Sequence, residues 1–125
     1  MKKIVKAKKE NLPNVIVWGS GKPVREWLHV KDASEAMIRS LNVDPTNQPL
    51  NVGVGKGISI IEMAEMIKLY SKYEGNLILD TSKPDGASYK TVDGSNGREH
   101  LNWSPQINFR QGLKETVEDY ILNKD

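Results

Sequence analysis

A short apolar run that ends at a glycine turn constrains this chain more than any other feature. Residues 15–18 read Val-Ile-Val-Trp, a β-rich sequence between a Pro-Asn pair and a glycine. Gly19 and Gly21 can adopt backbone angles that residues with a β-carbon avoid, and Pro23 stiffens the exit of the turn. Arg25 follows with a planar guanidinium group that suits phosphate. The segment therefore predicts a strand followed by a loop that holds an anion.

The rest of the chain alternates short apolar runs with signals for helix starts. Ser59 and Glu62 have the spacing of a capping box, as do Asp32 and Glu35, and Asn108 precedes a run of helical periodicity. This pattern predicts an α/β fold with short strands and three to four helices, in a single domain of residues 1–125. The expected strands are 15–18, 26–30, 50–53 and 76–80. The expected helices span 32–42, 59–75 and the segment from 108 onward, and 81–98 is expected to be a polar loop.

The first ten residues are strongly basic. Five lysines and one glutamate give them a net charge of +4, whereas the whole chain carries +2. A basic segment can bind nucleic acid. We favour the solvated face of a helix, because no aromatic residue stands between the lysines to stack on bases. We therefore expect no nucleic-acid partner, with an interaction module for RNA or an acidic protein as the alternative.

Composition excludes several classes of protein. No apolar run approaches the roughly 20 residues that cross a bilayer, and no apolar stretch of a signal peptide follows the lysine-rich start. The absence of cysteine excludes a disulfide scaffold, a cysteine-ligated metal and a thiol nucleophile. We expect a cytoplasmic protein with no membrane partner, and we assign no metal site.

A second glycine-rich turn, Gly53-Val-Gly-Lys-Gly57, stands between an expected strand and an expected helix, where nucleotide-binding turns occur. The dinucleotide motif places its third glycine three positions after the second, with an acidic residue about 20 residues further on. Here the third glycine comes two positions after the second, and the lysine is not followed by serine or threonine. We interpret these residues as a connecting turn and assign no cofactor-binding residue to them.

Five short blocks carry a resemblance to a known family. They are Trp-Gly-Ser-Gly at 18–21, Arg-Glu-Trp-Leu-His-Val-Lys-Asp at 25–32, Asn-Val-Gly at 51–53, Ser-Lys-Pro-Asp-Gly at 82–86 and Leu-Asn-Trp-Ser-Pro at 101–105. In this order and with nearly this spacing, they resemble the C-terminal part of the GDP-L-fucose synthases, which are extended short-chain dehydrogenases. The second block is shared with other nucleotide-sugar epimerases, whereas the first and fourth together point to the fucose branch.

The resemblance implies that this chain is the small, substrate-binding part of such an enzyme, without the Rossmann domain. Full-length relatives carry a serine and a Tyr-x-x-x-Lys pair, which epimerise and reduce GDP-4-keto-6-deoxy-mannose with NADP(H). We assign no catalytic residue and no cofactor to this chain. We expect it to bind a GDP-sugar only weakly and to be inactive alone.

The resemblance also assigns four residues to the substrate. Arg25 would lie beside the diphosphate, Trp18 against the nucleotide and Lys83 against the nucleotide sugar, while Asp85 would accept from sugar hydroxyls. Taken alone, each residue has another interpretation. Arg25 could pair with a neighbouring carboxylate at the surface, Trp18 could belong to the core and Lys83 could be solvated.

Other conspicuous residues are assigned to structure. An imidazole can act as an acid or base near neutral pH, but we expect His29 to fix the start of the following helix. Trp27, Trp103 and Phe109 are expected to pack. Two departures from the family leave the sugar preference open: Tyr89 stands where the family has arginine, and residues 94–97 add one position.

The missing Rossmann half has a consequence for partners. The expected helix 32–42 and the strand before it would pack on that half, so here they should expose apolar surface or a strand edge. We therefore expect a homo-oligomer or a strand-exchanged dimer. A fragment of a UDP-sugar epimerase or dTDP-sugar dehydratase is the alternative within the same class of enzymes.

Overall fold

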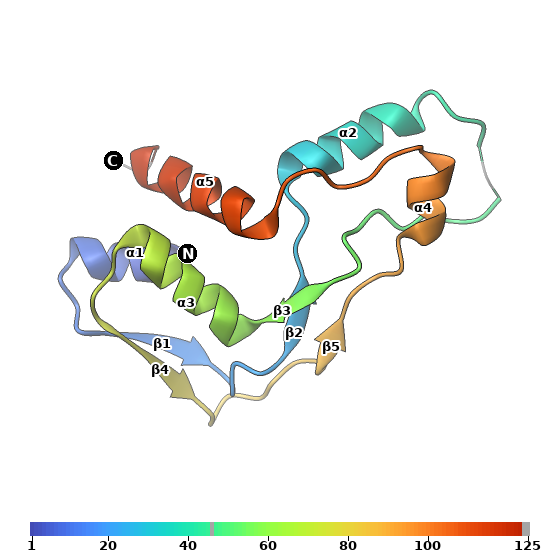
Figure 1. The fold of residues 1–125 in the computed structure, drawn as a ribbon. Coiled ribbons are helices and arrows are strands. Elements are labelled where there is room, and N and C mark those ends of the chain that lie inside the picture. Colours follow the sequence, from blue (N-terminus) through green and yellow to red (C-terminus); the bar gives the residue numbers. More distant parts are fainter. Residues whose placement is uncertain (46, 124–125) are drawn as a thin grey trace.

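The computed structural model describes residues 1–45 and 47–123, and it has the α/β fold that the sequence predicts (Figure 1). Within these residues, none of the helices combines the length and apolar character that crossing a bilayer requires. The helices are α1 (Lys2–Lys9), α2 (Val30–Ser40), α3 (Ile60–Ser71), α4 (Ser95–His100) and α5 (Phe109–Leu122). The strands are β1 (Asn14–Trp18), β2 (Val24–Glu26), β3 (Gly57–Ser59), β4 (Asn76–Asp80) and β5 (Tyr89–Lys90).

Two small sheets organise the chain. In the first, β1 and β4 run parallel, with Val15 opposite Leu77 and Trp18 opposite Asp80. In the second, β2 lies in the middle, antiparallel to β3 and parallel to β5. Two of the connections between the sheets, from β1 to β2 and from β4 to β5, run side by side (Figure 1).

The main hydrophobic core lies between the first sheet and three helices. Helix α3 contacts both α1 and α5, and α1 also contacts β1. Helix α1 buries its apolar side and leaves its lysines exposed, as expected of a basic helix face. The buried members of this core are Ile4, Ala7, Val15, Met63, Ile67, Tyr73, Leu113 and Val117.

The helix-start signals at the main core are confirmed. Ser59 accepts a hydrogen bond from the Glu62 amide while the Glu62 carboxylate accepts from the Ser59 amide, which completes the predicted capping box of α3. Asn108 caps α5 by accepting from the Arg110 amide. Ser59 is also the last residue of β3, so strand and helix are joined without an intervening loop.

A second, smaller core lies beside α2. Its buried members are Ala36, Leu101 and Trp103. The predicted capping box at Asp32 is wrong, because α2 begins at Val30 and its cap is His29, whose Nδ1 accepts from the Lys31 amide. The buried Asp32 carboxylate instead accepts from the amides of Gln106 and Ile107, and so ties α2 to the segment before α5.

Several predicted boundaries are corrected. The strand expected at 26–30 is β2, which ends at Glu26, and Val30 already belongs to α2. Helix α3 ends at Ser71 rather than at Gly75, because Lys72 adopts the left-handed conformation of a C-cap. The segment 50–53 is not a strand, and the expected loop 81–98 contains β5 and the start of α4, which brings the described residues to five helices. The strands at 15–18 and 76–80 are confirmed.

Candidate functional site

The candidate site forms where the parallel strands β1 and β4 end at the same edge of their sheet. Trp18 is opposite Asp80, and the amide of Gly19 donates to the Asp80 carbonyl over 2.9 Å. Beyond this point the chain enters residues 81–88, all of which are exposed. The carboxyl ends of parallel strands commonly carry ligand sites, because loops from separate parts of the sequence meet there.

The first glycine turn has the conformation that the sequence predicts. Gly19 and Gly21 have φ angles of +81° and +73°, which favour glycine. Between them, Ser20 donates twice to Asp85, from its amide over 2.8 Å and from its hydroxyl over 2.6 Å. The Ser20 hydroxyl, with smaller effects of the Ser20 amide and Lys22, lowers the pKa of Asp85 below the ordinary aspartate value. Asp85 therefore links the glycine turn to loop 81–88.

Trp18 presents an exposed indole to two ammonium groups. Its side chain is 65% exposed, so the alternative interpretation as a core residue does not describe it. Lys83 Nζ lies 5.9 Å from the ring centroid and Lys3 Nζ lies 5.0 Å from it. Both distances fit cation–π contacts. The attraction between the Lys83 ammonium and the Trp18 ring favours this position of the lysine side chain.

Arg25 lies against the same loop from the second sheet. The side chain is half-buried, and its Nη1 donates to the Val24 carbonyl over 2.6 Å. A β-carbon added at Gly86 would lie 3.0 Å from Nη2, so the guanidinium packs directly against the backbone of that glycine. The neighbouring carboxylates of Glu26 and Asp32 accept from backbone amides elsewhere.

The structure thus gathers all four predicted residues on or against loop 81–88. It adds two that the sequence reasoning missed, Ser20 and Lys3. Lys3 also donates to the Ile16 carbonyl over 3.2 Å, which holds its side chain along β1 toward the indole. No local spacing signals this contact, because it depends on how α1 packs beside β1. Two cations over an exposed aromatic ring, with Arg25 against the loop that carries Lys83, suit a ligand that combines negative charge with a flat ring.

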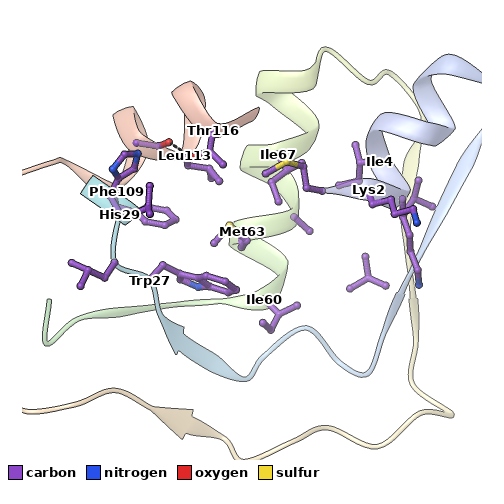
Figure 2. A pocket seen from close by; sticks show the side chains of 18 of the residues that line it. Lys2, Ile4, Trp27, His29, Ile60, Met63, Ile67, Phe109, Leu113 and Thr116 are labelled. Atoms are coloured by element: carbon purple, nitrogen blue, oxygen red, sulfur yellow. Dashed lines mark hydrogen bonds between the residues drawn. The ribbon is translucent and has the colours of Figure 1, made fainter. Parts of the chain in front are cut away.

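A large hollow is lined in part by Trp18. It has a volume of about 820 Å³ and lies between α1, β1, α3 and α5. Figure 2 shows Trp27, Met63 and Leu113 among the side chains around it, with Lys2 on the α1 side. The lining is mainly apolar and includes Trp18 and Lys3 but not Arg25, Lys83 or Asp85. The hollow therefore adjoins the candidate site without containing it.

The second glycine turn does not fit a dinucleotide phosphate. The amides of Val54 and Gly55 donate to the Glu26 carboxylate, the latter over 3.0 Å, so a side chain of the protein takes the place that a phosphate would need. The interpretation as a connecting turn is supported, because the segment leads directly into β3 and α3.

One Tyr-x-x-x-Lys spacing does occur in the sequence, from Tyr120 to Lys124. Lys124 lies outside the described residues. Tyr120 stands near the end of α5, at the opposite side of the molecule from the β1 and β4 ends (Figure 1). The spacing therefore gives no reason to place a catalytic residue at the candidate site.

Comparison with known proteins identifies relatives over nearly the whole chain. Residues 1–53 match the NAD dependent epimerase/dehydratase family. GDP-L-fucose synthase 1 of Arabidopsis thaliana is 37% identical over 98% of this chain and 38% of its own length. GDP-L-fucose synthase of Escherichia coli K12 is 34% identical over 100% of this chain and 41% of its own length.

A solved structure supports the same relationship. The crystal structure of a GDP-L-fucose synthetase from Naegleria fowleri bound to NADP has a TM-score of 0.89 and 32% identity, covering 98% of this chain and 39% of that one. This chain spans about two fifths of the length of these relatives. The resemblance inferred from the five blocks is confirmed, and the chain is a homologue of the GDP-L-fucose synthases over a segment of that size.

Proposed function

We propose that residues 1–125 form one substrate-binding domain that holds a GDP-sugar at loop 81–88, as part of a GDP-L-fucose synthase-like enzyme. The observation that carries the proposal is the exposed Trp18 indole with Lys3 and Lys83 over it, while Arg25 of β2 packs against Gly86 in the same loop as Lys83. The proposed compartment is the cytoplasm.

Each residue has a role in this proposal. Arg25, Lys83 and Lys3 neutralise the diphosphate, and the Arg25 guanidinium can donate two parallel hydrogen bonds to it. The Trp18 indole offers a flat apolar surface to the nucleobase. Asp85 accepts from sugar hydroxyls with the lone pairs that its bonds to Ser20 leave available. The position of Asp85 is set by Ser20 before any ligand arrives.

Titration calorimetry with GDP, GDP-mannose, UDP and dTDP tests the proposal on the 125-residue chain. We expect the guanine nucleotides to bind more tightly than UDP and dTDP. Arg25→Ala and Lys83→Ala should each weaken GDP binding about tenfold or more, since a hydrogen bond to a charged group contributes roughly 1.5–3 kcal/mol. Lys114→Ala on α5 is the control and should leave the affinity for GDP unchanged. Equal losses at Lys114, or tighter binding of UDP, would contradict the proposal.

We propose that this chain does not catalyse alone. Such relatives combine a substrate with NADP(H), and the chemistry depends on holding both reactants in one geometry. The cofactor supplies a hydride in the whole enzyme, and the residues described at loop 81–88 would bind and orient the sugar nucleotide. Turnover of a GDP-4-keto-sugar by the 125-residue chain with NADPH would overturn this part of the proposal.

We also propose that the chain self-associates through α2, either as a homo-oligomer or by strand exchange. One side of α2 buries Asp32 and Ala36, while Met37 is 71% exposed and Leu41, directly after the helix, is 83% exposed. Apolar side chains grouped in this way usually mark an interface. In a longer protein the same surface would meet the Rossmann half.

A further inference from the structure

The side chain of Glu26 binds two loops that are far apart in sequence. One carboxylate oxygen accepts from the amides of Val54 and Gly55, and the other accepts from the Val92 amide over 2.8 Å. A carboxylate that accepts several backbone N–H bonds makes stronger contacts than a neutral acceptor would. Glu26 is only half-buried, so this arrangement is not a requirement of burial alone.

Because Glu26 stands on the central strand β2, its hydrogen bonds tie that strand to the segments on both of its sides. Glu26 is the last residue of β2, where it is opposite Gly57 of β3. Val92 follows β5, the strand on the other side of β2. The carboxylate therefore fastens the β3 side and the β5 side to the same end of the central strand.

The segment around β5, which Glu26 holds, is continuous with loop 81–88 of the candidate site. Ser88, at the end of loop 81–88, accepts from the Val24 amide over 2.9 Å, and Arg25 is paired with Lys90. Neighbouring residues of a strand point to opposite faces, so the Glu26 contacts lie on the face away from the Arg25 guanidinium. Glu26 therefore acts on the Arg25 side only through the backbone of β2 and β5.

We propose that Glu26 is a positioning residue of the anion site, which sets how the Arg25 guanidinium meets the backbone of Gly86 in loop 81–88. The inference rests on the proposed function, because the anion is the diphosphate of the GDP-sugar. Asp85 fixes the middle of the loop to Ser20, and Glu26 fixes its downstream end through Val92. The two carboxylates hold the loop at two points and leave the cations of Arg25 and Lys83 to the ligand.

A double-mutant cycle separates positioning from a merely structural role. We expect Glu26→Gln to weaken GDP binding about tenfold in the otherwise unchanged chain, and less than about twofold in an Arg25→Ala background. A structural role would lower the melting temperature in both backgrounds and weaken binding by the same factor in both. Equal factors in the two backgrounds, or unchanged GDP affinity, would overturn the proposal. Glu65→Gln, an exposed substitution on α3, is the matched control.

Nuclear magnetic resonance of the ligand-free chain distinguishes failure of this inference from failure of the proposed function. We expect Glu26→Gln to shift the Arg25 Nε–H signal and the Lys83 and Asp85 amides, whereas Glu65→Gln leaves them in place. If GDP does not bind the wild-type chain, the proposed function fails, while these signals still decide the positioning role. Unmoved signals would overturn it. If Glu26→Gln does not fold, Glu26→Asp, which keeps the charge but shortens the reach, replaces it with the same expectations.

Discussion

The two hydrophobic cores differ in how completely this chain supplies them. Around β1 and β4, three helices bury eight residues, and Val117 is fully enclosed. Around α2 only three apolar residues are buried, while Val30, Met37 and Ile38 on the same helix are 58–71% exposed. The first region supplies most of its core by itself, although Ile16, Ile78 and Leu79 on its strands are 40–52% exposed. The second has apolar surface that matches no partner in the described residues, which is expected of an interface.

The contrast explains why α2 is held by polar contacts. Asp32 accepts from two backbone amides beside α5, and the Arg39 guanidinium donates to the Asn102 carbonyl. Such bonds are directional and fix the orientation of the helix without covering its apolar side. The difference teaches that α2 is placed by a few specific bonds, whereas α3 and α5 are placed by packing.

A matched pair of isoleucines gives the largest expected effect. Ile67 on α3 is 7% exposed and Ile38 on α2 is 58% exposed. We expect Ile67→Ala to lower the free energy of unfolding by about 2–5 kcal/mol, because it leaves a cavity in the main core. Ile38→Ala should change it by less than about 0.5 kcal/mol. Urea unfolding followed by circular dichroism measures both, and similar losses would show that the two regions do not differ as described.

The exposed side of α2 gives an intermediate effect. Met37→Lys places a charge on the proposed interface and should weaken self-association about tenfold or more, since a buried unpaired charge is costly. Leu69→Lys is the control, because Leu69 is 68% exposed on α3, outside that surface. Sedimentation velocity over a range of concentrations measures the equilibrium. A wild-type chain that is monomeric at high concentration, or an equal effect of both variants, argues against association through α2.

The smallest effect is expected at the edge of the first region, where loop 81–88 is held by polar bonds instead of packing. The Ser20 hydroxyl lowers the pKa of Asp85, so the bond contributes stability above the ordinary aspartate pKa, and this contribution is lost as the pH falls through the lowered value. We expect Ser20→Ala to raise the Asp85 pKa toward the ordinary aspartate value.

Carbon-detected titration of the Asp85 carboxyl group measures this shift. The stability difference between wild type and Ser20→Ala should shrink as the solution is acidified through that interval. A difference that stays constant with pH would show that the Ser20 contact does not depend on the charge of Asp85.

Sequence reasoning succeeded where the signal is local. The strands at 15–18 and 76–80, the capping box at Ser59 and the cap at Asn108 depend on neighbouring residues, and all four are confirmed. The positive φ angles of Gly19 and Gly21 follow in the same way from the need for a tight turn.

Sequence reasoning failed where the structure depends on distant contacts. Residues 50–53 read as a strand, but a strand exists only with a partner to pair with, and none pairs with them in the described residues. Asp32 has the spacing of a capping box, yet its carboxylate is taken by amides 74 and 75 positions away.

The candidate site combines residues that local sequence signals could predict with residues that depend on distant contacts. The sequence alone placed Arg25 after a glycine turn, but the grouping of Trp18, Lys83 and Asp85 with it came from the resemblance to a family. Their roles toward a ligand stay predictions. Lys3 entered only with the structure, because its contact with Trp18 depends on the packing of α1 beside β1.

The shared residue between β3 and α3 has a mechanical consequence. Ser59 ends β3 opposite Val24 of the central strand and also caps α3, so the strand that carries Arg25 is connected through one residue to the first turn of α3. Ligand binding at loop 81–88 is then expected to stabilise the first turn of α3. Slower hydrogen exchange of the Glu62 and Met63 amides would report ligand capture from a distance.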